Sequence, residues 1–162
     1  MVSAILKSLI MSLVLILPAF SARTYPVTPV ITGVSVTPEL TLDNVYREIL
    51  FSDIKYPAIV MRQVVWETQW LNCRNCSLKF NNLFGFMTKR GYMRFNSWVD
   101  CIKYYKKWQT KLHVEKYDDY YAFLVHVKFA LGESYNNALR TLNIRSITEK
   151  FETTIPDWLR RI

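Results

Sequence analysis

Residues 57–70 read PAIVMRQVVWETQW, and the fold prediction begins from this stretch. Pro57 suits the first turn of a helix, where a missing N–H breaks no helical hydrogen bond. Val60 and Val64 then recur at helical spacing, so the stretch predicts a helix that buries one face. Glu67 lies on that same face, and its carboxylate is therefore expected to point inward.

Other stretches predict further helices and one hairpin. Helices are expected at about residues 42–50, 98–108, 120–131 and 135–143, where capping residues or breaks flank apolar positions 3.6 residues apart. Residues 83–86 and 92–95 predict a short β-hairpin. The chain has only 4 Gly and 6 Pro, too few for a turn-dense sandwich. The sequence therefore predicts one mainly α (α+β) domain with a short β-hairpin lobe.

Residues 1–21 have the pattern of a secretory signal peptide. Lys7 precedes an apolar stretch at residues 9–17, and small residues at Ala19 and Ser21 allow cleavage after Ser21. A membrane-spanning helix needs about 20 apolar residues, so we expect no stable membrane insertion after cleavage. An uncleaved anchor is the alternative. The mature protein is expected in the periplasm or outside the cell.

Composition and charge indicate the organisation and the partners of the residues that follow the signal peptide. Residues 22–38 are rich in Pro, Thr and Val and suit an extended tether, which leaves residues 39–162 as the folded domain. The chain has 21 Lys+Arg against 13 Asp+Glu, a net charge of +8 that falls to +7 when the signal peptide and its lysine are removed. The expected anionic partners are cell-envelope polymers and membrane surfaces, with nucleic acid a weaker alternative. The basic residues are scattered, so a solvated basic surface is the simpler alternative.

Glu67 is the most informative residue for chemistry. It is flanked by Trp66 and Trp70, and apolar surroundings disfavour the charged form of a carboxyl group. A raised pKa would let Glu67 deliver a proton near neutral pH. The structural alternative is an ion pair with an Arg or Lys.

The three cysteines allow several interpretations. Cys73 and Cys76 form a CxxC pair, but a structural zinc site needs four ligands, and His113 and His126 are not at finger-like spacing. A redox CxxC lacks its usual βαβ context. In an oxidising compartment we expect a disulfide from Cys101 to Cys76 or Cys73, with no metal and no cofactor.

Three segments, taken in order, resemble a known family. They are QVVWETQW at residues 63–70, NNLFGF at 81–86 and YMRFNSW at 92–98. Together they are similar to the glucosaminidase family of peptidoglycan hydrolases, which has a lysozyme-like fold. FALGESY at residues 129–135 has the spacing of the family's Tyr-Ala-x-x-x-x-Tyr segment. The resemblance covers about residues 40–145.

The resemblance implies roles for individual residues. Glu67 would be the general acid and Tyr135 would line the cleft beside it. Asn82 and Phe84 would shape the floor of the glycan groove, and sugar rings stack well on aromatic side chains. The substrate-binding positions that it implies are Trp70, Asn82, Phe84 and Gly85.

The chain also departs from the family pattern. No Asp or Glu lies between Gly85 and Ser97, where many members carry a second carboxylate, and Gln69 stands where Gly is common. Leu131-Gly132-Glu133 replaces the usual Thr-Asp-Pro. The substrate's own 2-acetamido oxygen is a possible nucleophile. We therefore expect a monomeric endo-β-N-acetylglucosaminidase acting on peptidoglycan glycan strands, with a lytic transglycosylase or an inactive wall-binding module as alternatives.

Overall fold

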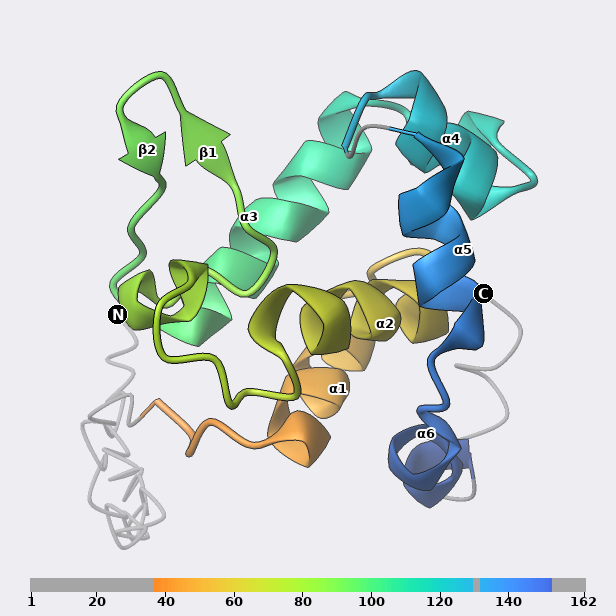
Figure 1. The fold of residues 1–162 in the computed structure, drawn as a ribbon. Helices are drawn as coiled ribbons and strands as arrows, with labels where there is room; N and C mark the ends of the chain where they lie inside the picture. The colour runs from red at the N-terminus through yellow and green to blue at the C-terminus, as the bar shows by residue number, and fades with distance from the viewer. Residues whose placement is uncertain (1–36, 130–131, 153–162) are drawn as a thin grey trace, which may run out of the picture. The chain divides into compact units, whose positions relative to one another are not determined.

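The computed structural model describes residues 37–129 and 132–152 (Figure 1). The predicted signal peptide, most of the predicted tether and Leu131 lie outside these residues. The described residues all belong to one compact unit of the chain.

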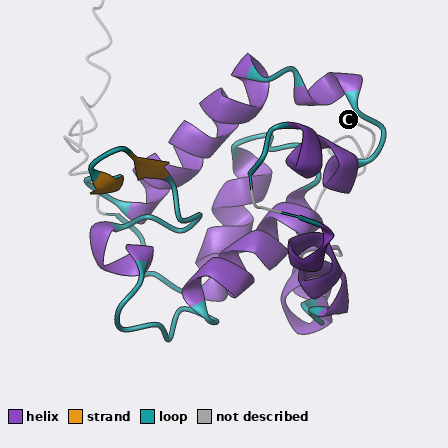
Figure 2. Ribbon diagram, turned by 45° about the horizontal axis from the view of Figure 1, so that its top comes forward, coloured by secondary structure: helices purple, strands orange, loops and turns teal. Residues whose placement is uncertain are grey.

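The described residues form six α-helices, two short 3₁₀ helices and one two-stranded antiparallel sheet (Figure 2). The prediction of a mainly helical domain with a short hairpin is therefore confirmed. None of the helices in this part of the chain is both long and apolar enough to span a membrane. The elements in chain order are α1 (Leu42–Phe51), α2 (Pro57–Thr68), η1 (Ser77–Phe80), β1 (Met87–Thr88), β2 (Gly91–Tyr92), α3 (Trp98–Lys111), η2 (Val114–Lys116), α4 (Tyr120–His126), α5 (Glu133–Thr141) and α6 (Arg145–Glu152).

Side-chain caps fix where three of the helices begin. The Thr41 hydroxyl accepts the N–H of Asn44 at 3.2 Å at the start of α1. Ser97 caps α3 in the same way, as predicted, and Asp119 caps α4. Each such cap stabilises a helix by about 1 kcal/mol.

The end of α4 and the presence of α6 differ from the sequence prediction. Helix α4 ends at His126 because Lys128 adopts a left-handed φ of 54°. The N–H of Phe129 then bonds the carbonyl of Leu124 at 3.0 Å, which completes a Schellman motif. No glycine marks this stop in the sequence. Helix α6 is short, and Phe151 anchors it by packing edge-on against Tyr46.

Helix α2 lies at the centre of the packing. It contacts α1 and α5, while α1 also contacts α3 and α6. Figure 1 shows α3 running from the hairpin side of the domain to α4. An aromatic cluster fills the core beside α3, where the rings of Phe84 and Tyr105 have centroids 4.0 Å apart. Burial of side chains of this size contributes about 1.5–3 kcal/mol each relative to exposure.

Candidate functional site

The structure brings Glu67 and Tyr135 together from distant parts of the sequence. Glu67 is half-buried in the last turn of α2, and Tyr135 is buried in the first turn of α5. Because α2 and α5 pack against each other, the Tyr135 hydroxyl reaches Glu67 and donates to Oε1 at 3.0 Å. The family resemblance implied that Tyr135 lies beside Glu67.

The Glu67 carboxyl group has no cationic partner in the described residues. All five ion pairs in this part of the chain join other side chains. Burial raises the pKa of Glu67, and the hydrogen bond from Tyr135 only partly opposes this rise. Within the described residues the structure therefore lacks the ion pair that was the alternative for an inward Glu67, and burial favours the neutral form of its carboxyl group.

Gly85 lies directly against this carboxyl group. Its φ of +67° falls in the left-handed region that favours glycine. A Cβ at this position would lie 2.9 Å from Glu67 Oε2, closer than a real side chain tolerates. The glycine of the NNLFGF segment is therefore needed both for its backbone conformation and for the room it leaves to Glu67.

The last turn of α2 and the turn that follows it expose two tryptophans close to Glu67 in the sequence, Trp66 and Trp70. Gln69 and Trp70 have φ values of 50° and 60°, and the N–H of Trp70 bonds the carbonyl of Val65 at 3.0 Å. The buried Thr68 hydroxyl stabilises this turn, donating to the Val64 carbonyl at 2.7 Å and accepting the N–H of the residue after Trp70 at 3.1 Å. The exposed fractions of Trp66 and Trp70 are 47% and 40%. Exposed aromatic faces of this kind can stack on sugar rings.

Asn82 and Phe84 are buried, so in this structure they do not face solvent. The Asn82 amide donates to the carbonyls of Phe86 at 2.8 Å and Met93 at 3.1 Å, and its oxygen accepts the N–H of Phe86 at 3.0 Å. These bonds join the two segments that lead into and out of the hairpin. Asn82 and Phe84 flank the segment that contains Gly85 as buried residues, so any role in a groove comes through shape rather than direct contact.

The disulfide differs from the predicted pairing. Cys73 bonds Cys76, and Cys101 is free, so the predicted bond from Cys101 to Cys76 or Cys73 is wrong. Cys101 is completely buried on α3, and its sulfur accepts the N–H of Leu83 at 3.4 Å. Burial also raises the pKa of the Cys101 thiol to about 12. Its position on the apolar face was predicted correctly, but that face turns it into the core.

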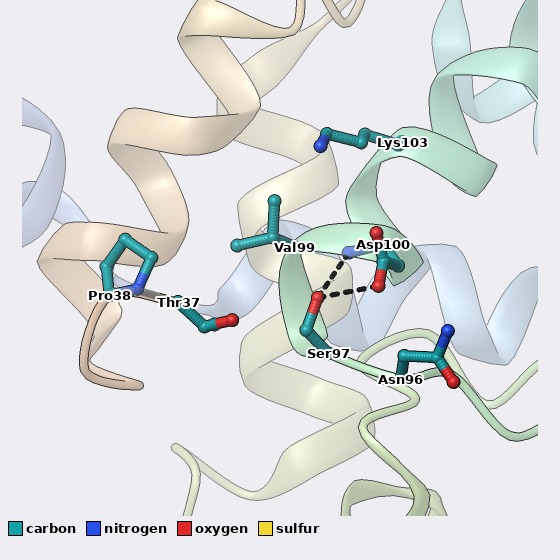
Figure 3. A pocket seen from close by; sticks show the side chains of 7 residues that line it. All are labelled: Thr37, Pro38, Asn96, Ser97, Val99, Asp100 and Lys103. Atoms are coloured by element: carbon teal, nitrogen blue, oxygen red, sulfur yellow. Dashed lines mark hydrogen bonds between the residues drawn. The ribbon is translucent and has the colours of Figure 1, made fainter. Parts of the chain in front are cut away.

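A separate pocket of about 230 Å³ lies where α3 begins (Figure 3). The Ser97 hydroxyl there accepts the N–H of Asp100 at 3.1 Å and donates to its carboxylate at 2.9 Å. None of the predicted site residues lines this pocket. Its polar groups serve the helix cap, and we assign it no chemistry.

Some residues around Glu67 were not assigned a role from the sequence. Gln63, one turn before Glu67, is completely buried and donates to the Tyr135 hydroxyl at 3.4 Å. Tyr105 was placed only on an apolar helix face, yet its hydroxyl donates to Gln63. A buried tyrosine hydroxyl requires a partner, and this was the available signal.

Comparison of the chain with protein-family models, curated proteins and solved structures found no significant match. The described residues also contain no group of three or more His, Cys, Asp and Glu side chains that could hold a metal ion. The family resemblance drawn from the sequence therefore stays a prediction.

Proposed function

We propose that this chain is an exported glycoside hydrolase that cleaves β-1,4 bonds of the peptidoglycan glycan strand, with Glu67 as its general acid. One observation carries the proposal: the half-buried Glu67 carboxyl has a raised pKa, no ion-pair partner in the described residues and a single tyrosine donor. A general acid needs this combination, because it must hold a proton at a pH where free carboxyl groups have lost theirs.

The exposed aromatic side chains beside Glu67 support a sugar substrate. Trp66 and Trp70 lie on either side of it in the sequence, and both expose a large part of their rings. Sugar rings bury their apolar faces against aromatic rings, so a glycan strand is a substrate that suits this surface. The excess of Lys and Arg over Asp and Glu suits an anionic cell-envelope polymer. The resemblance to the glucosaminidase family points to the same substrate.

The proposed reaction needs one enzymic acid. Glu67 protonates the glycosidic oxygen, and the bond from C1 to that oxygen breaks with its electron pair going to the leaving sugar. The substrate's 2-acetamido oxygen bonds to C1 as the leaving group departs. Water then attacks C1, and the bond from C1 to the acetamido oxygen breaks with its electron pair returning to that oxygen. The Glu67 carboxylate takes the proton of the attacking water, which restores the acid. No carboxylate between Gly85 and Ser97 is required by this route, and none is present.

The missing second carboxylate also favours two alternatives. A lytic transglycosylase likewise works with a single Glu, but the 6-hydroxyl of the sugar attacks C1 and a 1,6-anhydro product forms. An inactive module would bind the wall without turnover.

Digestion of purified peptidoglycan with the mature protein tests the proposal, with released fragments identified by mass spectrometry. New reducing-end N-acetylglucosamine is the expected product. Fragments with 1,6-anhydro ends would assign the transglycosylase reaction instead. Binding without any released fragment would reject both enzymes and leave the wall-binding module.

A further inference from the structure

A series of buried polar side chains, joined by hydrogen bonds and called the polar chain, runs from Glu67 into the core. Beyond Tyr135 it passes through Gln63, Tyr105, Tyr120 and Gln109, each with an exposed fraction of 1% or less. These four residues come from α2, α3 and α4. Burial of a polar group costs about 1–3 kcal/mol unless it is hydrogen-bonded, and no buried side-chain polar atom of the described residues lacks a partner.

The backbone of Lys55 fixes the Gln109 end of this polar chain. Its N–H donates to Gln109 Oε1 at 3.0 Å, and its carbonyl accepts from Gln109 Nε2 at 3.0 Å. A backbone N–H only donates and a carbonyl only accepts, so the Gln109 amide has one permitted orientation. Its second Nε2 hydrogen donates to the Tyr120 hydroxyl at 3.0 Å.

The direction of every later bond follows from that anchor. Tyr120 accepts from Gln109, so its own proton goes to Tyr105, its other hydroxyl partner. Tyr105 then donates to Gln63 Oε1, and Gln63 Nε2 donates to the Tyr135 hydroxyl at 3.4 Å. A reversed chain would leave the buried Tyr120 proton without an acceptor, at a cost of about 1–3 kcal/mol.

All the donors therefore point toward Glu67, and the last bond ends on Oε1. Burial raises the pKa values of Tyr105, Tyr120 and Tyr135, so these hydroxyl groups keep the protons that the chain requires. Because Oε1 always receives a hydrogen bond, the proton of neutral Glu67 is left to Oε2. That oxygen faces Gly85, where the missing side chain leaves room beside it.

We propose that the chain from Gln109 to Tyr135 is a positioning relay that keeps Glu67 Oε1 an acceptor and makes Oε2 the oxygen that delivers the proton. This inference rests on the proposed role of Glu67 as general acid. Tyr135 contacts Glu67 directly, whereas Gln63, Tyr105, Tyr120 and Gln109 are positioning residues that act through it. None of the four carries a charge, so the relay directs the proton without adding an ion to the core.

Removal of one hydroxyl in the middle of the relay tests it. Tyr105→Phe keeps the ring packing but frees the Gln63 amide to turn, so that Tyr135 donates to Gln63 instead of Glu67. The control is Tyr104→Phe on the same helix, whose ring contacts Phe86 and whose hydroxyl is outside the relay. Tyr135→Phe, which deletes the direct donor, sets the scale of the effect.

The first measurement is the pKa of the Glu67 carboxyl group by NMR titration of the free protein, which needs no enzymatic activity. Loss of a donor to the charged form should raise this pKa in Tyr105→Phe, in the same direction as in Tyr135→Phe, and leave it unchanged in Tyr104→Phe. If Tyr105→Phe does not fold, Gln63→Met removes the donor to the Tyr135 hydroxyl, which can then accept the proton of neutral Glu67, so the pKa of Glu67 should again rise. An unchanged pKa in the folded relay variant would overturn the relay.

The second measurement is glycan cleavage by the same variants. We expect kcat to fall by about 10- to 100-fold in Tyr105→Phe with KM within about twofold, and the alkaline limb of the pH profile to move to higher pH. A normal kcat with an unmoved limb would overturn the relay. Absence of cleavage by every form, with the NMR shift intact, would instead reject the proposed function while the hydrogen-bonded chain stands.

Discussion

Replacement of Gly85 by alanine tests the geometry around Glu67. A residue with a side chain at a φ of +67° costs about 1–2 kcal/mol, and the stiffer unfolded chain returns about 0.4–1 kcal/mol. The conformational part of the penalty is thus about 1 kcal/mol. The added Cβ would also lie 2.9 Å from Glu67 Oε2, so the carboxyl group must move.

Glu67 Oε2 is the end of a flexible side chain and can move aside, but its movement strains the bond from the Tyr135 hydroxyl to Oε1, and loss of that bond would cost up to about 3 kcal/mol. We therefore expect Gly85→Ala to lower the free energy of unfolding by about 1–4 kcal/mol. Gly91→Ala is a control for the contact, because nothing lies within 4 Å of its added Cβ, although its φ of +109° lies outside the left-handed well and costs an added side chain more than the φ of Gly85 does. Only the conformational penalty should remain there.

A double-mutant cycle measured by urea unfolding separates the two contributions. In a Glu67→Ala background the carboxyl group is absent, so Gly85→Ala should cost only about 1 kcal/mol. The coupling between the two positions should then be between about 0.5 and 3 kcal/mol. A coupling below about 0.3 kcal/mol, within the error for independent sites, would refute the close contact between Gly85 and Glu67.

Three further predictions concern stability and the cysteines. Burial raises the pKa of Glu67 above its ordinary value of 4.5, so above pH 4.5 the folded state binds more protons than the unfolded state, and the free energy of unfolding should fall as pH rises. Glu67→Gln cannot titrate, so its free energy of unfolding in urea should rise relative to that of wild type between pH 4 and 7. A difference between the two proteins that stays constant with pH would contradict the account. Gln69→Gly should stabilise the protein by about 0.5–1 kcal/mol, because Gln69 occupies a left-handed helix end, and a loss of stability would count against that geometry. One thiol should react per chain in denaturant and none in the native protein, because Cys101 is buried and Cys73 is bonded to Cys76, whereas three reactive thiols would exclude the disulfide.

Local sequence patterns predicted the helices well because each pattern has a direct structural cause. Pro57 and Ser97 begin helices in the structure as their residue types indicate. The inward face of α2 was also predictable from spacing. A hairpin was predicted too, but its strands are Met87–Thr88 and Gly91–Tyr92 rather than residues 83–86 and 92–95. The early end of α4 was not, because Lys128 takes a left-handed conformation that its residue type does not favour.

The site was predictable where two residues share one helix and less so where several elements meet. Glu67 stood out as an acid on an apolar face, and Gln63 lies one turn before it on the same face. The contact with Gly85 and the hydrogen bonds through Tyr105 depend on how α3 and the hairpin lobe pack against α2. The disulfide was mispredicted for the same reason, because the sequence places Cys101 on an apolar face without revealing what covers it.

The rate of glycan release by Glu67→Gln, compared with wild type on purified peptidoglycan, tests the central claim most directly. Gln keeps the size of Glu and can accept the Tyr135 hydrogen bond, but it cannot protonate a leaving oxygen. Turnover should fall by at least about 100-fold while binding to the wall and the circular dichroism spectrum are retained. Glu133→Gln, at an exposed carboxylate two residues before Tyr135, should keep substantial activity. Near-normal hydrolysis by folded Glu67→Gln would contradict the account.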